Sequence, residues 1–247
     1  MTKKYKIEKV VSELKLVADL ELYQKSSDLK RLSKDFYEYS PILNKQLKNF
    51  IAEIVVRPLS VDAIINTVEI CNKYSVPLTL RGSGTGNYGQ CVPLKGGIVM
   101  VMSALRKIRN FNKETGEITV EAGCLLRDIN EVLIDYGRQL RLLPSTWRSA
   151  SIAGFIAGGS GGIGSVRWGF LRDPGHLIEL EIITLEDSPT KLKLFADDAE
   201  ALNHAYGTNG IITALTLTTT PLVKWHEVVV DCLDWTQAVE LLKNINR

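Results

Sequence analysis

Glycine alternates with small polar residues in the stretch Arg81-Gly82-Ser83-Gly84-Thr85-Gly86-Asn87-Tyr88-Gly89-Gln90, which follows a short apolar run over 76–80. The apolar run predicts a buried strand. Alternate glycines allow positive φ, so successive N–H groups can point into one concavity. Ser83 and Thr85 add hydroxyl donors, and Tyr88 is the first bulky side chain. The loop therefore suits a phosphate or pyrophosphate, since each charge-assisted hydrogen bond contributes roughly 1.5–3 kcal/mol.

Two segments match the letter of the dinucleotide fingerprint, 84–89 and 159–164. A Rossmann site also needs a helix that opens directly from the glycines, because the helix N-terminus holds the pyrophosphate. Neither 90–97 nor 165–170 has helical periodicity, so both Rossmann interpretations fail. No Gly-Lys-Ser or Gly-Lys-Thr ending is present, which excludes a P-loop. Glycine-rich surface turns without a ligand remain the alternative.

The composition is that of a globular protein with no marked charge. The 247 residues carry a net charge of +2 and are 45% hydrophobic, which gives no argument for nucleic acid or an anionic membrane. No run approaches the ~18 apolar residues of a membrane span, and Lys3, Lys4 and Lys6 are not followed by the apolar run of a signal peptide. Thirteen of the 19 glycines fall in 82–97 and 154–169, which predicts two glycine loops that converge on one ligand.

The four cysteines are scattered without Cys-x-x-Cys spacing, which argues against zinc. We interpret them as buried thiols in a reducing compartment, and the sequence therefore predicts a cytoplasmic protein. These cysteines are Cys71, Cys91, Cys124 and Cys232.

Hydrophobic periodicity predicts helices and strands in an alternating order. Residues 1–50 are expected to form a helical arm. The following pattern predicts a strand at 54–56 that stops at Pro58, a helix capped by Ser60, and a strand at 97–102 buried on both faces. Further expected elements are a hairpin over 108–120, a helix at 125–136, a half-solvated strand at 177–185 paired with 191–194, a short helix from Asp197 to near Gly207, a strand at 210–217, a strand at 227–231 and a helix at 235–245.

With these elements in order, the chain resembles the FAD-binding domain of the vanillyl-alcohol-oxidase or p-cresol methylhydroxylase (PCMH) type. The nearest resemblance is to the FAD-linked oxidases that include the flavin-carrying chain of glycolate oxidase and D-lactate dehydrogenase-like enzymes. Residues 80–89 are similar to the family's first pyrophosphate loop. Residues 144–146 with 151–158 are similar to its proline and double-glycine stretch, although Ala153 replaces a usual glycine. Residues 207–213 are similar to the segment whose backbone meets the adenine.

The resemblance implies an α+β fold of two α+β subdomains with FAD between them. It implies a helical arm at 1–50, a PCMH-type FAD-binding domain at 51–222, and at 223–247 the start of a truncated or missing substrate domain. The pyrophosphate would lie on the first loop, and the ribityl chain and flavin along the second. The cofactor-binding residues that follow from this are Arg81, Gly82, Ser83, Gly84, Thr85, Gly86, Asn87, Pro144, Ser145, Thr146, Ser151, Gly154, Gly158, Gly159, Gly161, Gly162, Ile211 and Ile212.

The resemblance further implies an FAD-dependent oxidoreductase, in which flavin N5 accepts hydride from a small 2-hydroxy acid, such as glycolate or D-lactate, or from an alcohol. Two alternatives stay open: a non-catalytic FAD-binding subunit or electron-transfer partner of another chain, and a different flavin reductase on the same scaffold. Expected partners are the small-molecule substrate and a second subunit or missing C-terminal domain. Family members that tether the flavin often use a histidine near the first loop, and 77–97 has none, so non-covalent FAD is predicted.

No residue is assigned as the catalytic base. His176, His204 and His226 are scattered, and none lies in a glycine loop. We expect His204 to be solvated on a polar helix and His176 to follow a turn at 173–175. Arg148, Arg167 and Arg172 lie beside the second glycine loop and could bind a substrate carboxylate, or simply be exposed. Trp168 is interpreted as core or flavin packing, and Cys91 as part of a structural turn.

Overall fold

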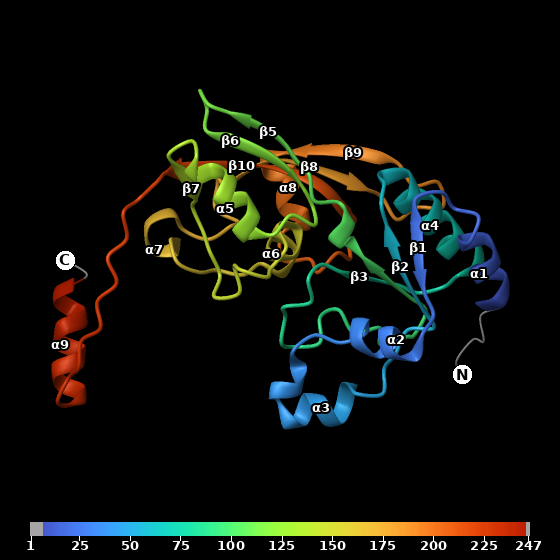
Figure 1. Cartoon of the computed structure of the whole chain (residues 1–247), viewed down its shortest axis with the longest axis horizontal. Helices are drawn as coiled ribbons and strands as arrows, with labels where there is room; N and C mark the ends of the chain where they lie inside the picture. Colours follow the sequence, from blue (N-terminus) through green and yellow to red (C-terminus); the bar gives the residue numbers. More distant parts are fainter. Residues whose placement is uncertain (1–6, 246–247) are drawn as a thin grey trace.

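A computed structural model describes residues 7–245, so Lys3, Lys4 and Lys6 lie outside the described residues. The fold has two sheets with helices packed against them (Figure 1). The first sheet has the order β1-β2-β4-β3, with β2 and β3 both parallel to β4 and β1 antiparallel to β2. Its strands are β1 (Leu20–Tyr23), β2 (Ile54–Pro58), β3 (Leu78–Arg81) and β4 (Ile98–Val101).

The core of the first sheet follows the predicted pattern. All of β4 is buried, as expected for a continuous apolar run between two covered faces. Helix α4 (Val61–Tyr74) begins at the predicted cap, where the Ser60 hydroxyl accepts a hydrogen bond from Ala63 N at 3.2 Å. Ile64 and Val68 of α4 are buried against the sheet together with residues of α1 (Ile7–Leu14), which packs beside α4.

The arm before β2 is only partly helical, because β1 lies within it. β1 pairs with β2 over four residues, so this part of the chain belongs to the first sheet. The rest of the arm contains α1, α2 (Ser26–Leu32), the 3-10 turn η1 (Tyr37–Tyr39) and α3 (Pro41–Leu47). The expectation of a purely helical arm over 1–50 is therefore wrong at β1.

The second sheet is antiparallel, in the order β5-β6-β10-β8-β9, and β7 also pairs with β10. The predicted hairpin and strand pair are confirmed. Helix α5 (Leu126–Ile134) is confirmed but shorter than predicted, and α6 (Ile152–Gly158) packs beside it on the same core. The strands are β5 (Ile108–Asn112), β6 (Glu117–Glu121), β7 (Arg138–Leu140), β8 (Leu177–Ile183), β9 (Lys191–Phe195) and β10 (Ile211–Pro221).

Strand β8 differs from its predicted half-solvated pattern. Glu181 is buried, and its carboxylate pairs with Arg109 at 2.9 Å and with Lys191 at 3.2 Å. The alternation of charged and apolar residues therefore places the glutamate in an ion-pair network on the sheet and not in open solvent. Burial of charged groups is tolerated where they are paired in this way.

Short helical turns lie in three of the connecting segments. The second glycine stretch contains α6 and is followed by α7 (Ser165–Trp168), so the expectation of no helix over 165–170 is wrong for this one turn. The predicted helix from Asp197 is α8 (Ala196–Ala199) followed by η3 (Glu200–Leu202). It ends before the predicted Gly207, because the chain turns to contact α6. The 3-10 turn η2 (Met102–Ala104) follows β4.

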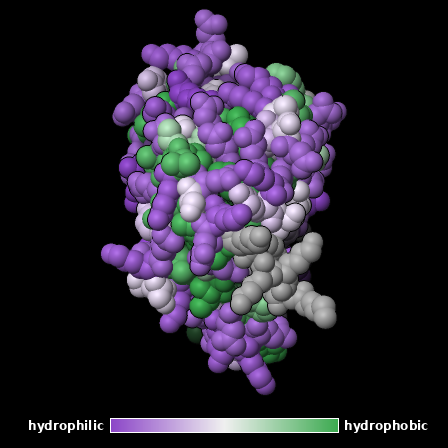
Figure 2. Space-filling model, turned by 90° about the vertical axis from the view of Figure 1, so that its right-hand side faces the viewer, coloured by the Kyte–Doolittle hydropathy of each residue, from purple (hydrophilic) through white to green (hydrophobic). Residues whose placement is uncertain are grey.

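The C-terminal part of the described chain leaves the second sheet at Pro221. Residues 222–234 are extended without a partner strand, so the predicted strand at 227–231 is wrong, whereas the predicted helix is confirmed as α9 (Trp235–Ile245). Figure 1 shows α9 apart from both sheets, at the opposite end of the molecule from α1. On the α1 side, hydrophilic side chains predominate, with hydrophobic patches between them (Figure 2).

Candidate cofactor site

A cavity of about 550 Å³ lies where the two glycine stretches meet. The first sheet contributes the loop after β3, and the second contributes 144–146, α6 with its following turn, and the start of β10. Sixteen of the eighteen predicted cofactor residues line it: Gly82, Ser83, Gly84, Thr85, Gly86, Asn87, Pro144, Ser145, Thr146, Ser151, Gly154, Gly158, Gly159, Gly161, Ile211 and Ile212. The two loops therefore converge on one cavity, as the glycine distribution predicts.

The first loop presents unused backbone donors. Among the described residues, none of the amides of 83–87 donates a hydrogen bond. Gly84 has φ +70°, which permits this curvature, and the space where its Cβ would lie is taken by the Arg81 guanidinium. The loop over 82–87 thus combines free N–H groups with small side chains, and a diphosphate requires both.

The two glycine stretches touch at Ser151. A Cβ on Gly82 would collide with the Ser151 hydroxyl, and a Cβ on Gly154 would lie 2.8 Å from it. Ser151 Oγ is buried and, among the described residues, has no hydrogen-bond partner. Since buried polar groups are nearly always satisfied, an unpaired hydroxyl on a cavity wall fits a polar ligand.

The second stretch is built from a helix and a tight turn. α6 ends at Gly158 and is capped by Gly159, which has the left-handed φ of +59°, and the turn continues to the N-terminus of α7. Gly158 is less crowded than its neighbours Gly159 and Gly162, because the nearest atom to its missing Cβ is Ser160 Oγ at 3.7 Å. The space beside Gly158 is thus open to the cavity that this residue lines.

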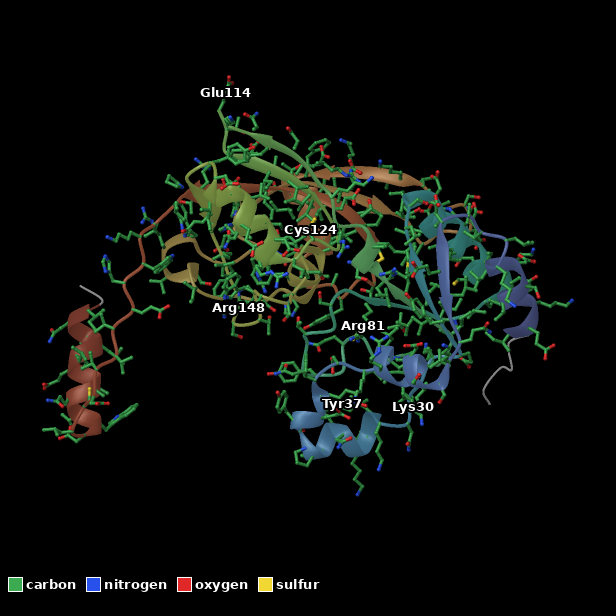
Figure 3. The ribbon with its side chains drawn as sticks, viewed as in Figure 1. Lys30, Tyr37, Arg81, Glu114, Cys124 and Arg148 are labelled. Carbon is green, nitrogen blue, oxygen red and sulfur yellow. The ribbon has the colours of Figure 1, made fainter. Side chains whose placement is uncertain are left out.

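Two predicted cofactor residues, Arg81 and Gly162, do not line the cavity. The Arg81 guanidinium lies behind the loop, where Nη1 donates to Lys34 O and to Cys91 Sγ at 3.2 Å (Figure 3). Gly162 lies against the backbone of Leu143, whose carbonyl oxygen occupies the place of a Cβ. Both residues support the lining from behind, and a direct contact of either with the cofactor remains a prediction.

A turn at 203–207 supplies cavity residues that sequence reasoning missed. His204 and Tyr206 have positive φ of +58° and +52°, which is strained for side chains of this size. Their amides donate to Ile156 O and Ala157 O at the end of α6, and His204 Nε2 lies 2.9 Å from Tyr206 Oη. His204 is exposed as predicted, but it lies in this turn and its ring packs on Gly159. The sequence signal that could have indicated this turn is its position directly before the 207–213 segment, which was expected to lie along the adenine.

Asp35 and Cys91 also line the cavity without having been predicted as site residues. Burial raises the pKa of the Cys91 thiol, against the opposing charge of Arg81. A raised pKa disfavours the thiolate, which is the nucleophilic form of a cysteine. Asp35 is almost fully buried and accepts hydrogen bonds only from backbone amides.

The remaining charged candidates lie outside the cavity lining. Arg148 stacks on Trp147 with its Cζ 4.6 Å from the ring centroid, on the second-sheet side of the molecule (Figure 3). Arg167 lies 5.1 Å from the ring of Trp168, which packs against the second core as expected. His176 is buried after the predicted turn, with Nε2 2.7 Å from Trp168 O. Arg172 and His226 also lie outside the lining.

The described residues offer no metal centre built from their own side chains. Across 7–245, no group of three or more His, Cys, Asp or Glu is arranged to hold a metal ion. No described helix is long and apolar enough to cross a membrane. All four cysteines are free; Cys71, Cys91 and Cys124 are buried as predicted, and Cys232 is partly exposed.

Residues 52–189 match the family model of the FAD binding domain, and this match covers more than half of the chain. The chain belongs to the FAD binding domain family. FAD is accordingly the cofactor of this domain, and the unpaired Ser151 hydroxyl, the free amides of 83–87 and the glycine-lined cavity all fit it. The predicted boundaries at 51 and 222 remain predictions.

Relatives of this FAD binding domain include three curated proteins. The chain is 28% identical over 179 residues to a D-lactate dehydrogenase of Anaerostipes hadrus, covering 70% of the chain and 37% of that protein. It is 30% identical over 189 residues to the mitochondrial D-lactate dehydrogenase [cytochrome] of Arabidopsis thaliana, covering 74% and 32%. It is 30% identical over 131 residues to glycolate oxidase subunit GlcD of Bacillus subtilis, covering 53% and 27%. The chain spans about a third of the length of these relatives.

Solved structures share the fold of this FAD binding domain at lower identity. An alkyldihydroxyacetonephosphate synthase superposes with a TM-score of 0.75 at 20% identity, over 89% of this chain and 41% of that one. A BBE-like 1 protein of Physcomitrella patens gives a TM-score of 0.70 at 18% identity, over 86% and 44%. These structures confirm the predicted α+β fold of two subdomains around the cavity.

Proposed function

We propose that the chain is the FAD-binding part of an oxidoreductase that oxidises a small 2-hydroxy acid or a related alcohol. The observation that carries this proposal is the cavity, whose lining includes the free loop amides of 83–87, the unpaired Ser151 hydroxyl and the glycines of both stretches. Its volume lies within the roughly 300–1,000 Å³ typical of cofactor sites. The substrate class comes from the printed activities of the D-lactate dehydrogenase and glycolate oxidase relatives.

Within this proposal, each glycine stretch has its own task. The first loop binds the diphosphate through the amides and hydroxyls of 82–87. Residues 144–146 and 151–162 line the ribityl chain and the flavin, and Ile211 and Ile212 lie along the adenine. The bound FAD supplies the chemistry, as an acceptor of hydride at the flavin. The chain's own residues bind the cofactor, hold it extended and keep its surroundings free of side chains that would displace it.

Substrate selection is proposed to depend on groups outside the described residues. Within 7–245, no arginine or lysine lines the cavity, so no guanidinium or ammonium group there pairs with a substrate carboxylate. Hydride transfer requires near-attack geometry, and positioning contributes roughly 7–11 kcal/mol to lowering such barriers. A further domain or a second subunit would supply this positioning and a general base. The chain alone is therefore expected to bind flavin without fast turnover.

Anaerobic mixing of the FAD-loaded chain with D-lactate, with glycolate and with other hydroxy acids tests this proposal. We expect slow flavin bleaching with little difference between the acids, and a large gain in rate and selectivity when a longer chain or partner domain is added. Bleaching that stays slow and unselective in the complete protein would contradict the proposed substrate class. Fast bleaching by one acid with the 247-residue chain alone would contradict the need for a further domain.

The flavin is proposed to be held without a covalent bond. Cys91 is the one thiol among the described cavity residues, and burial raises its pKa, which disfavours the thiolate that would attack the flavin. Acid precipitation should leave all of the flavin in the supernatant. Flavin that stays with the pellet would contradict this, and a Cys91→Ser variant would then show whether Cys91 is the tether.

A further inference from the structure

A short segment before the FAD binding domain runs along the back of the first glycine loop. This segment, 34–37, joins α2 to η1 and is hydrogen-bonded to the loop near its start, middle and end. Arg81 Nη1 donates to Lys34 O, and Phe36 N donates to Gly86 O at 2.8 Å. Asp35 Oδ2 then accepts from two amides at the end of the loop, Gly89 N at 2.9 Å and Gln90 N at 3.1 Å.

Within this segment, Asp35 makes the hydrogen bonds to the end of the loop. Its second oxygen, Oδ1, accepts from Tyr37 N at 2.9 Å, so both oxygens accept hydrogen bonds and all the donors are backbone amides. The residue is only 5% exposed. Burial raises the pKa of Asp35, while the three amides and the charge of Arg81 oppose that shift. A buried carboxylate is costly unless it is fully hydrogen-bonded, which makes this position strongly specified.

The hydrogen bonds divide the loop into two parts. The amides of Gly89 and Gln90 are bound to Asp35, whereas among the described residues the amides of 83–87 remain free. The carboxylate also lies beneath the loop at Gly86, where Oδ2 would be 3.4 Å from a Cβ. The bound end of the loop thus fixes the curvature of the free end. Loops that are ordered before binding lose less entropy when the ligand arrives.

We infer that Asp35 is a positioning residue for FAD, which shapes the first glycine loop so that its free amides are ordered before the diphosphate binds. This inference rests on the proposed binding of the diphosphate at 82–87. The same arrangement explains Arg81 without a direct contact to the cofactor. Arg81 binds the same segment through Lys34 O, and its positive charge offsets the Asp35 carboxylate next to a site for an anion.

The test compares Asp35→Asn with Glu38→Gln. Glu38 lies in the same part of the chain, is exposed, and pairs with Lys34 Nζ at 2.8 Å without contacting the loop. Hydrogen exchange of the flavin-free proteins should show faster exchange at Gly89 and Gln90 in Asp35→Asn and no change in Glu38→Gln. Asp35→Ser, which retains one oxygen acceptor, replaces Asp35→Asn if that variant does not fold.

Titration with FAD and with ADP, at a temperature where every variant is folded, completes the test. We expect Asp35→Asn to raise the Kd for both ligands by about tenfold to a hundredfold, since the effect acts at the diphosphate that they share. Glu38→Gln should stay within about twofold of wild type. Wild-type FAD affinity in Asp35→Asn would overturn this inference and leave the proposed function intact. A folded wild-type protein that binds no FAD would overturn the proposed function and the inference with it.

Discussion

The two glycine stretches reach the same cavity by different structural means. The first loop, 82–89, is irregular and is hydrogen-bonded from behind by 34–37. The second, 151–164, is a helix followed by tight turns, so its backbone is largely satisfied by local hydrogen bonds. The comparison shows that glycine has separate tasks here. Gly84 permits a left-handed backbone, Gly82 makes room for Ser151, and Gly158 leaves space for the ligand.

The largest effect is expected from Gly84→Val in the first loop. Valine strongly disfavours the φ of +70°, and its Cβ would collide with the Arg81 guanidinium. Flavin retained after desalting should fall at least about a hundredfold while most secondary structure remains, because the strain and the lost contacts total roughly 3 kcal/mol or more.

Gly137→Ala is the matched control for Gly84→Val. Gly137 also has a positive φ, +66°, but nothing lies within 4 Å of its missing Cβ and it does not line the cavity. This variant should lose about 1 kcal/mol of stability and keep its flavin. Equal flavin content in both variants would contradict the role given to the first loop.

Paired substitutions at Gly82 and Ser151 test the contact between the two stretches. Gly82→Ala would press on Ser151 Oγ, and Ser151→Ala would remove that oxygen, so the double variant should regain thermal stability that Gly82→Ala loses. Ser151→Ala alone should weaken FAD binding by about three- to tenfold, the worth of one hydrogen bond of ~0.5–1.5 kcal/mol. Unchanged FAD affinity in Ser151→Ala would show that the hydroxyl does not contact the cofactor.

Gly158→Ala tests whether the second stretch acts by leaving space. A methyl group at this helical position has room in the flavin-free protein, so its thermal midpoint should be unchanged or slightly higher. FAD affinity should nevertheless fall by about tenfold, because the methyl enters the cavity. A stable variant with wild-type affinity would contradict the placement of the ligand beside α6.

The smallest effect is a pH dependence of stability that arises from Asp35. The pKa of Asp35 is raised in the folded state, so its contribution to stability is present below the unfolded pKa and is lost as pH rises through the folded pKa. The stability of wild type relative to Asp35→Asn should therefore decline over this acidic window, by ~1.4 kcal/mol per unit of pKa separation. Thermal unfolding of both proteins across that pH range measures it. A constant difference between them would contradict the raised pKa.

Sequence patterns predicted those parts of the fold that depend on local information. The apolar run of β4, the Ser60 cap of α4 and the turn of the β5–β6 hairpin all carry short-range signals. β1 was missed because a four-residue strand is defined by its pairing with β2. The strand predicted at 227–231 has apolar residues but no partner strand among the described residues.

The site was predictable where glycines mark it and not where tertiary contacts do. The glycine positions and the family resemblance gave most of the cavity lining. The positive φ of His204 and Tyr206 depends on docking against the end of α6, and the position of Asp35 depends on a contact 54 residues away. Arg81 was assigned to the cofactor because it begins the loop, but its direction was set by Lys34 and Cys91.

Titration of the flavin-free, refolded chain with FAD tests the central claim most directly. The account predicts one FAD per chain, a flavin absorbance that persists after desalting, and displacement by ADP, because the diphosphate site lies on the first loop. Circular dichroism of the same sample shows whether the protein is folded. A folded chain that retains no FAD would contradict the assignment of this cavity as the cofactor site.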